Sequence, residues 1–257
     1  MENRTGASGA IGAAMVAQSP PDGYTFLLEG ATFATLPIVA RSLPLDYDAA
    51  LVPVTQVTSQ PYILGLRAGF PADDLAGFLA EARRRPGEVT FGTPGVAHIG
   101  HFMGELLQMM ASIKLEHVPY RGGADAAREL AAERIDAAII SYSSLQPAVE
   151  RGARLIATTA AQRQPALARI SAIAETLPGY ELISWTGAFA PTGTPLAAQE
   201  RFAEALNHAL RDPQTAGRLT SLGADPAISN PEAFRGVIDR DRDVARRIVA
   251  ATRLRTG

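Results

Sequence analysis

The sequence predicts an α/β protein, and three observations support this fold class. Short apolar segments alternate with amphipathic segments of helical period along nearly the whole chain. Hydrophobic residues make up 47% of the chain and charged residues 19%, a balance that supports a packed core rather than disorder. The 257 residues allow one large domain or two small ones, at roughly 100–200 residues per domain.

Short apolar runs bounded by turn-forming residues are expected to form the strands. In chain order, these runs are residues 24–28, 52–57, 62–66, 89–91, 115–118, 135–140 and 155–158. The apolar segment 182–190, which carries the only tryptophan, Trp185, completes the series.

Segments with apolar residues three and four positions apart are expected to form the helices. A helix that follows Pro71 ends at Pro86, and the arginines before that proline complement the negative end of the helix dipole. Pro195 is typical of a first helical turn and opens a helix to about Leu210. The other expected helices are residues 99–111, 124–132, 214–222 and 231–253.

Charge and composition exclude several classes of function. The 24 basic and 26 acidic residues give a formal net charge of -2, which argues against a protein that holds nucleic acid by neutralising phosphates. No apolar run approaches the ~18–20 residues of a spanning helix, so we expect no direct membrane insertion. The absence of cysteine excludes disulfides, thiolate metal sites and cysteine nucleophiles.

A glycine-rich segment near the start resembles a phosphate-binding loop only superficially. Gly6, Gly9 and Gly12 lie in the sequence GASGAIG. The dinucleotide fingerprint requires a preceding strand and Gly-x-Gly spacing, and both are absent. We therefore interpret this segment as a flexible helix entry and expect no cofactor.

Two histidines raise the possibility of a metal site. His98 and His101 are three residues apart at the start of a helix, a spacing that can place two imidazoles on one face. Only Glu105 lies within a turn as a further ligand. We expect no metal, with His101 donating a hydrogen bond near the helix N-terminus and His98 partly exposed.

A cluster of serines follows the strand at 135–140, where the sites of α/β proteins lie. Its members are Ser141, Ser143 and Ser144. No Gly-x-Ser-x-Gly elbow surrounds them, so a capping role is favoured over nucleophilic catalysis. An α/β hydrolase-like enzyme that uses this cluster remains an alternative.

Small or hydroxyl residues recur where expected strands end. The five openings are residues 30–32, 93–95, 120–123, 141–144 and 186–187. Such openings expose backbone N–H groups at the positive ends of helices, where carboxylates bind favourably. Two sets facing each other across a cleft would form a binding protein rather than a catalyst.

Several stretches together resemble the substrate-binding proteins of tripartite tricarboxylate transporters, the TctC/Bug-type receptors. The matching stretches, in family order, are residues 3–12 (NRTGASGAIG), 21–25 (PDGYT), 91–95, 101–106, 118–122 (VPYRG), Trp185, 190–195 (APTGTP), 222–224 and 231–234. They cover essentially the whole chain, and their joint order and spacing are specific.

The resemblance implies a periplasmic, non-enzymatic solute-binding protein with two lobes. Lobe I would be residues 1–92 plus 187–257 and lobe II residues 93–186. Hinge strands would cross near 91–93 and 185–188, and the lobes would close on a small carboxylate for delivery to a membrane permease. We expect a monomer. A ligand-sensing protein that feeds a signalling partner is the second alternative, and a fragment that binds nothing is the third.

The resemblance also implies which residues contact the ligand. In lobe I these are Gly30, Ala31 and Thr32. In lobe II these are Thr93, Gly95, His98, His101, Tyr120, Arg121, Gly122 and Ser141. Arg121 is expected to pair with a carboxylate, and a structural salt bridge is its alternative role.

The chain departs from the family pattern in three ways. Relatives usually carry a signal peptide, a first strand and a Pro/Gly-rich loop before the segment at 2–4, so we expect an N-terminally truncated form without its first βα unit. His98 and Gly100 stand where relatives usually have hydroxyl residues, which points to a different ligand. Ile140 stands where relatives often have a polar or acidic residue, which removes one amine-binding group.

Overall fold

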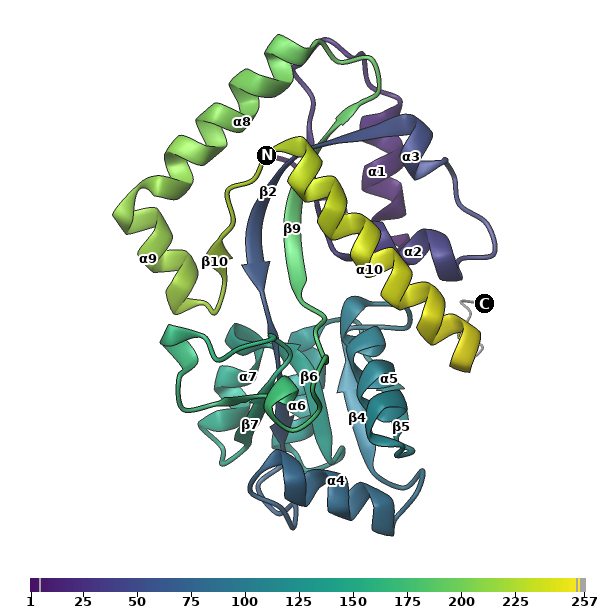
Figure 1. The fold of residues 1–257 in the computed structure, drawn as a ribbon, viewed down its shortest axis with the longest axis vertical. Coiled ribbons are helices and arrows are strands. Elements are labelled where there is room, and N and C mark those ends of the chain that lie inside the picture. The colour runs from purple at the N-terminus through teal and green to yellow at the C-terminus, as the bar shows by residue number, and fades with distance from the viewer. Residues whose placement is uncertain (5, 253, 255–257) are drawn as a thin grey trace. The chain divides into compact units, whose positions relative to one another are not determined.

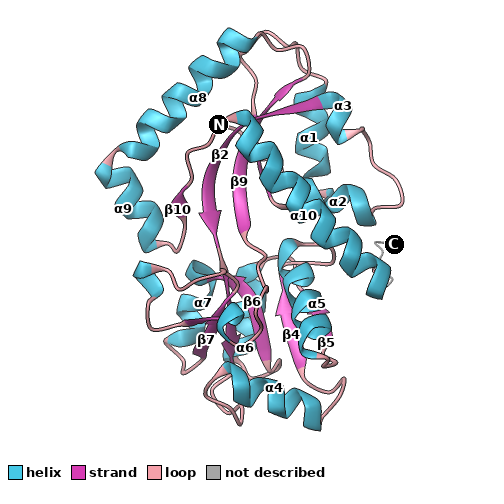
Figure 2. Cartoon of the chain, viewed as in Figure 1, coloured by secondary structure: helices cyan, strands magenta, loops and turns pink. Residues whose placement is uncertain are grey.

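The computed structural model describes residues 1–4, 6–252 and 254 (Figure 1). The chain divides into two compact units, each with its own sheet. Unit 1 comprises Met1–Ser59 and Trp185–Gly257, and unit 2 comprises Gln60–Ser184. The α/β class predicted from the sequence is confirmed in both units (Figure 2).

Unit 1 contains a four-stranded sheet with the order β1-β9-β2-β10. Its strands are β1 (Leu27–Gly30), β9 (Ser184–Pro191), β2 (Leu51–Gln60) and β10 (Asp225–Pro226). β1 pairs antiparallel with β9, so that Glu29 lies opposite Gly187. β10 pairs antiparallel with β2, with Asp225 opposite Ser59. β1 and β10 are therefore the edge strands of this sheet.

The helices of unit 1 are η1 (Ala7–Gly9), α1 (Ala10–Ala17), α2 (Thr32–Val39), α3 (Tyr47–Ala50), α8 (Leu196–Arg211), α9 (Pro213–Ser221) and α10 (Pro231–Thr252). The long helix α10 packs against α2. Aromatic rings hold the core together. Phe33 of α2 stacks on Phe189 of β9 at 3.9 Å between ring centroids, and Phe234 of α10 meets Trp185 edge-on at 5.1 Å.

Unit 2 contains a six-stranded sheet with the order β5-β4-β6-β3-β7-β8. Its strands are β3 (Tyr62–Leu66), β4 (Thr90–Thr93), β5 (Glu116–Pro119), β6 (Ala137–Ser141), β7 (Arg154–Thr158) and β8 (Ser171–Ala172). β4 runs parallel to β5 and to β6, whereas β3 runs antiparallel to β6 and β7. The three parallel strands β5, β4 and β6 therefore have their carboxyl ends at the same end of the sheet.

The helices of unit 2 are α4 (Leu75–Arg84), α5 (Ile99–Ala111), α6 (Gly123–Ala131), α7 (Tyr142–Val149) and the short turns η2 (Pro165–Leu167) and η3 (Ile173–Glu175). Helices α5, α6 and α7 pack against the strands, and α6 also packs on α7. Buried aliphatic residues such as Leu130, Ile140 and Leu145 form the core between these helices and the sheet.

The bounds predicted for two elements are confirmed to the residue, namely residues 62–66 as β3 and residues 99–111 as α5. The glycine-rich start leads into a helix, as expected, with Gly6 and Gly9 before α1 and Gly12 inside it. Gly9 is the N-cap of α1 and has φ 95°, a left-handed conformation that glycine adopts without a Cβ clash.

The compact units also differ from the expected lobes. The second division falls at 184/185, close to the expected 186/187, but the first falls at 59/60 rather than at 92/93. Strand pairing is the reason. β3 lies between β6 and β7 in the sheet of unit 2, so residues 60–92 belong to that unit.

Within the described part of the chain, no helix combines the length and apolar character that crossing a membrane requires.

Candidate ligand-binding site

The carboxyl ends of β4, β5 and β6 gather most of the predicted contacts of unit 2 at one sheet edge. Thr93 is opposite Pro119 in the parallel pair of β4 and β5, and the N–H of Tyr120 donates to the carbonyl of Thr93 at 2.9 Å. Ser141 ends β6. Helices α5, α6 and α7 each begin just after one of these strands. Ligands of α/β sheets bind at such edges.

Thr93 shapes the loop after β4. Its side chain is fully buried, and its hydroxyl lies 3.1 Å from the carbonyl oxygen of Gly95, to which it donates. The same hydroxyl lies 2.7 Å from Nε2 of His117. Gly95 has φ 151°, and a Cβ there would lie 3.7 Å from the carbonyl oxygen of Tyr120. The Thr93 side chain thus holds the loop, and the positive φ at position 95 favours glycine there.

His98 forms the N-cap of α5. Its Nδ1 accepts a hydrogen bond from the N–H of Gly100 at 3.2 Å, and its ring stacks on Tyr62 at 5.9 Å between centroids. The side chain is half-buried, as the sequence predicted. Burial lowers the pKa of His98 to about 4. At neutral pH the ring is therefore uncharged, and Nε2–H is the group it offers as a donor.

His101 lies in the interior of unit 2. Only 5% of the residue is exposed, and its ring stacks on His117 at 3.6 Å between centroids. Its Nδ1 accepts a hydrogen bond from the N–H of Ala97 at 3.3 Å, and its Nε2 lies 3.5 Å from Oε1 of Glu105. The expectation that His101 donates at the helix N-terminus is wrong, since Nδ1 accepts there. This residue supports the turn before α5 from beneath.

His117 is a residue that the sequence analysis did not assign. It lies on β5, between the Thr93 hydroxyl and the ring of His101. Burial, and then the positive charge that His101 would carry, lower the pKa of His117 to about 3. No local pattern marks His117, because its partners come from β4 and α5.

The loop after β5 presents the one cation proposed for ligand binding. Arg121 is exposed, and among the described residues no ion pair of Arg121 is recorded, so the structural salt bridge has no support. Gly122 is the N-cap of α6, and a Cβ there would meet nothing within 4 Å. The Tyr120 ring packs beside Gly92. Arg121 and Gly122 thus border open space at the N-terminus of α6.

Ser141 caps α7, as the sequence analysis favoured. Its Oγ accepts from the N–H of Ser144 at 3.3 Å and lies 2.8 Å from the Ser144 hydroxyl and 3.3 Å from that of Ser143. In the described residues, the recorded side-chain bonds of Ser141 all stay within this serine cluster. Among these described contacts Ser141 has no histidine or carboxylate partner to act as a base, so the geometry favours the cap over the nucleophile.

The predicted contacts of unit 1 lie between β1 and α2. Gly30 ends β1, Ala31 is the N-cap of α2 and Thr32 is its first residue. Ala31 and Thr32 are buried, whereas Gly30 is half-buried. A Cβ at Gly30 would lie 3.5 Å from the carbonyl oxygen of Trp185 on the neighbouring strand. These residues therefore offer backbone groups rather than exposed side chains.

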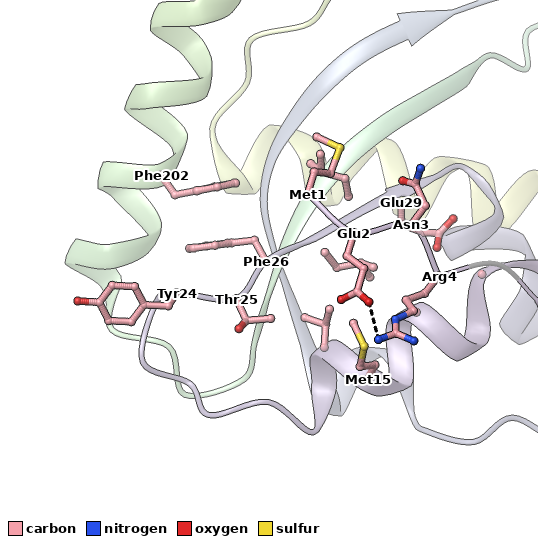
Figure 3. Close-up of a pocket in the computed structure, with 15 residues that line it drawn as sticks. Met1, Glu2, Asn3, Arg4, Met15, Tyr24, Thr25, Phe26, Glu29 and Phe202 are labelled. Atoms are coloured by element: carbon pink, nitrogen blue, oxygen red, sulfur yellow. Dashed lines mark ion pairs between the residues drawn. The ribbon is translucent and has the colours of Figure 1, made fainter.

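A pocket of about 760 Å³ lies within unit 1, between the first residues of the chain and the segment that leads into β1 (Figure 3). The residues that line it include Met15 of α1, Phe202 of α8 and the ion pair between Glu2 and Arg4, at 2.5 Å. Glu29 of β1 also lines this pocket. The sequence analysis assigned no role to Glu29.

The described residues contain no group of three or more His, Asp and Glu side chains placed to hold a metal ion.

Comparison with known proteins identifies the family. Residues 1–254 match the family described as "Tripartite tricarboxylate transporter family receptor". A UPF0065 protein from the tcbD-tcbE intergenic region of Pseudomonas sp. strain P51 is 32% identical over 257 residues, covering 99% of this chain and 76% of that protein.

Solved structures agree with this assignment. The structure of R. palustris Rpa4515 with adipate is 30% identical, covers 97% of this chain and 84% of its own, and gives a TM-score of 0.89. The periplasmic binding protein BugD is 25% identical, covers 100% of this chain and 87% of its own, and gives a TM-score of 0.85. The two structures therefore share the fold of this chain over nearly its whole length. The chain belongs to the tripartite tricarboxylate transporter receptor family.

Proposed function

We propose that this chain binds a small carboxylate-type metabolite in the periplasm and delivers it to the membrane permease of a tripartite tricarboxylate-type transporter. The family supports the transport role, and a relative solved with adipate supports a carboxylate ligand. The periplasmic location is supported by the likeness to BugD. We further propose that the chain acts as a monomer and catalyses no reaction.

The observation that carries the proposal is the edge of the unit 2 sheet. Three helices begin there, α5, α6 and α7, and their first N–H groups carry partial positive charge. Arg121 stands at the same edge, exposed and without a recorded ion pair within the described residues. A guanidinium and several helix N-termini at one edge suit a carboxylate. Gly30, Ala31 and Thr32 are the contacts that we propose from unit 1.

Calorimetric titration of the purified chain with a panel of small mono-, di- and tricarboxylates, with and without amino groups, tests the proposal. We expect at least one of these ligands to bind. A ligand at 100 times its Kd should stabilise the fold by about 2.7 kcal/mol, which a thermal-shift assay would detect. Replacing Arg121 by Gln should weaken binding roughly tenfold or more, because a charged hydrogen bond contributes about 1.5–3 kcal/mol.

Arg151→Gln is the matched control. Arg151 is also an exposed arginine of unit 2, but it follows the C-terminal end of α7 rather than a helix N-terminus. Its replacement should leave the affinity unchanged. Failure of every carboxylate to bind the wild-type chain would refute the proposed function, whereas equal affinities of R121Q and wild type would refute the role of Arg121. Uptake of the bound ligand into vesicles that contain the cognate permease, with and without this chain, tests delivery.

A further inference from the structure

The loop between β4 and α5 comprises residues 94–98 and carries two of the proposed ligand contacts, Gly95 and His98. Both ends of this loop are held by side chains. The Thr93 hydroxyl, just before it, lies 3.1 Å from the Gly95 carbonyl oxygen, and Nδ1 of His98 caps α5. Between these two ends the backbone turns at Ala97. The conformation of Ala97 therefore affects where both proposed contacts lie.

Ala97 has an unfavourable backbone conformation. Its φ is 61°, in the left-handed region where the Cβ of an L-residue comes too close to the following carbonyl oxygen. Glycine adopts this conformation without that cost, but here the position is an alanine, and it is fully buried. A residue of this kind keeps a positive φ only where its surroundings hold it there.

His101, in the first turn of α5, supplies a contact that holds Ala97. Its Nδ1 accepts a hydrogen bond from the N–H of Ala97 at 3.3 Å. Because Nδ1 accepts, the proton of the neutral ring is on Nε2, which lies 3.5 Å from Oε1 of Glu105. The ring is buried and stacks on His117 at 3.6 Å between centroids. These contacts fix the orientation of the ring, so that Nδ1 faces the turn.

We propose that His101 is a positioning residue, which holds the strained turn at Ala97 and thereby sets the affinity of the site for its ligand. This inference rests on the proposed function above, because it concerns the contacts at Gly95 and His98. Without the hydrogen bond to Nδ1, the turn should relax toward a negative φ at Ala97, and the backbone on both sides would shift. His101 then acts through Ala97 rather than by touching the ligand.

Two amide variants of His101 isolate this hydrogen bond. In His101→Asn the side-chain oxygen can take the position of Nδ1, whereas in His101→Gln the amide lies one atom farther along the side chain. Both variants lose the ring stack on His117. Amide hydrogen exchange of residues 94–100 in the ligand-free chain should be about fivefold faster in H101Q than in H101N. The member of the carboxylate panel that binds wild type most tightly should bind H101Q about fivefold more weakly than H101N.

Ala97→Gly tests whether the hydrogen bond acts through the strained turn. Glycine needs no support at a positive φ, so in the A97G background the fivefold factor between H101Q and H101N should fall to about one. Ser112→Gly is the matched control. Ser112 also has a positive φ, 52°, but it is the C-cap at the opposite end of α5. In the S112G background the fivefold factor should persist.

The inference is overturned if H101N and H101Q bind the ligand equally tightly, or if the fivefold factor persists in the A97G background. Faster exchange in H101Q that is spread evenly over β4, β5 and β6 would also overturn it, because His101 would then only support the core. Should neither His101 variant fold, A97G alone decides. Slower exchange of residues 94–100 than in wild type supports the strained turn, and equal or faster exchange overturns it.

The two readouts separate this inference from the proposed function. Absence of binding by the entire carboxylate panel would overturn the proposed function, and with it the effect of His101 on affinity. The exchange of residues 94–100 is measured without a ligand, so it would still show whether His101 holds the turn. Binding by wild type together with equal affinities of H101N and H101Q would leave the proposed function intact and overturn only the role of His101.

Discussion

At the scale of single residues, the histidines of unit 2 show how burial sets the charge near the proposed site. His117 holds the Thr93 hydroxyl on one side and stacks on His101 on the other. Burial lowers the pKa of His117 to about 3 and that of His98 to about 4, compared with about 6.5 for an exposed histidine. The rings of His98 and His117 are therefore neutral at neutral pH, and Arg121 and the helix N-termini supply positive charge nearby.

These pKa values make the stability of the fold depend on pH. Between the folded and unfolded pKa values of a histidine, the unfolded chain binds a proton that the folded chain does not. The stabilisation by His117 is therefore complete above pH 6.5 and is lost as pH falls toward 3. In urea, the free energy of unfolding of the wild-type chain should be lower at pH 5 than at pH 7, and His117 should contribute about 2 kcal/mol of this difference. In His117→Gln the difference between the two pH values should be smaller by that amount.

His208→Gln serves as the control for this measurement, because His208 is exposed on α8. Its replacement should leave the difference between the two pH values as in wild type. The interpretation of His117 as a buried neutral ring fails if H117Q and wild type lose the same free energy of unfolding on acidification.

At the scale of elements, the first turn of the helix that follows a strand determines which backbone N–H groups are available at the end of that strand. Several helices of unit 2 begin with a side-chain cap, including α4 at Asp74, α5 at His98 and α7 at Ser141. Each cap satisfies one N–H and leaves the remaining N–H groups of the first turn directed outward. A short polar residue after an apolar run is a local signal, so the sequence could predict the capping role of Ser141. It could not predict α2, in which Pro37 and a nearly fully buried surface obscure the helical pattern.

Ser141→Ala tests whether this serine is a cap or a nucleophile. Loss of the cap should lower the free energy of unfolding by about 1 kcal/mol, measured in urea. The wild-type chain should hydrolyse no member of an ester and amide panel. Ser143→Ala, which changes an exposed serine of the same cluster, should leave stability nearly unchanged. Turnover by wild type that disappears in S141A would contradict the binding-protein interpretation and favour the hydrolase.

At the scale of the whole molecule, the two units have separate sheets. Close packing around Gly187 holds the core of unit 1. A Cβ at this position of β9 would overlap with the ring of Phe234 on α10, and that ring is fully buried. Since neither the strand nor the ring has free space, the substitution must displace one of them.

Gly187→Ala should therefore destabilise unit 1 by about 1–3 kcal/mol. Hydrogen exchange should show faster exchange in β1, β2 and β9 but not in β3, β4 and β6, because the two sheets belong to different cooperative units. Gly217→Ala is the control. Gly217 lies within α9, a Cβ there meets nothing within 4 Å, and alanine favours the helix by about 1 kcal/mol. Equal loss of protection in both sheets would contradict independent units.

The family resemblance and the local motifs of the site were accessible from the sequence, since strand ends, glycines and caps are defined by neighbouring residues. The division between units was not. Residues 60–92 belong to unit 2 because β3 pairs with β6, where Tyr62 lies opposite Ser141. These two residues are far apart in the chain. The hydrophobic periodicity of a segment indicates whether it forms a helix or a strand, but not which strands it pairs with.

By itself, the sequence determined the α/β class, the positions of β3 and α5, the membership of the receptor family and the residues at the strand ends. Only the tertiary structure decided which of those residues are available to a ligand. It buried His101 in the interior of unit 2 and bonded the Thr93 hydroxyl to Gly95 and His117. The physical reason is that exposure, charge and pKa depend on contacts between residues distant in the chain, whereas composition and spacing describe only neighbours.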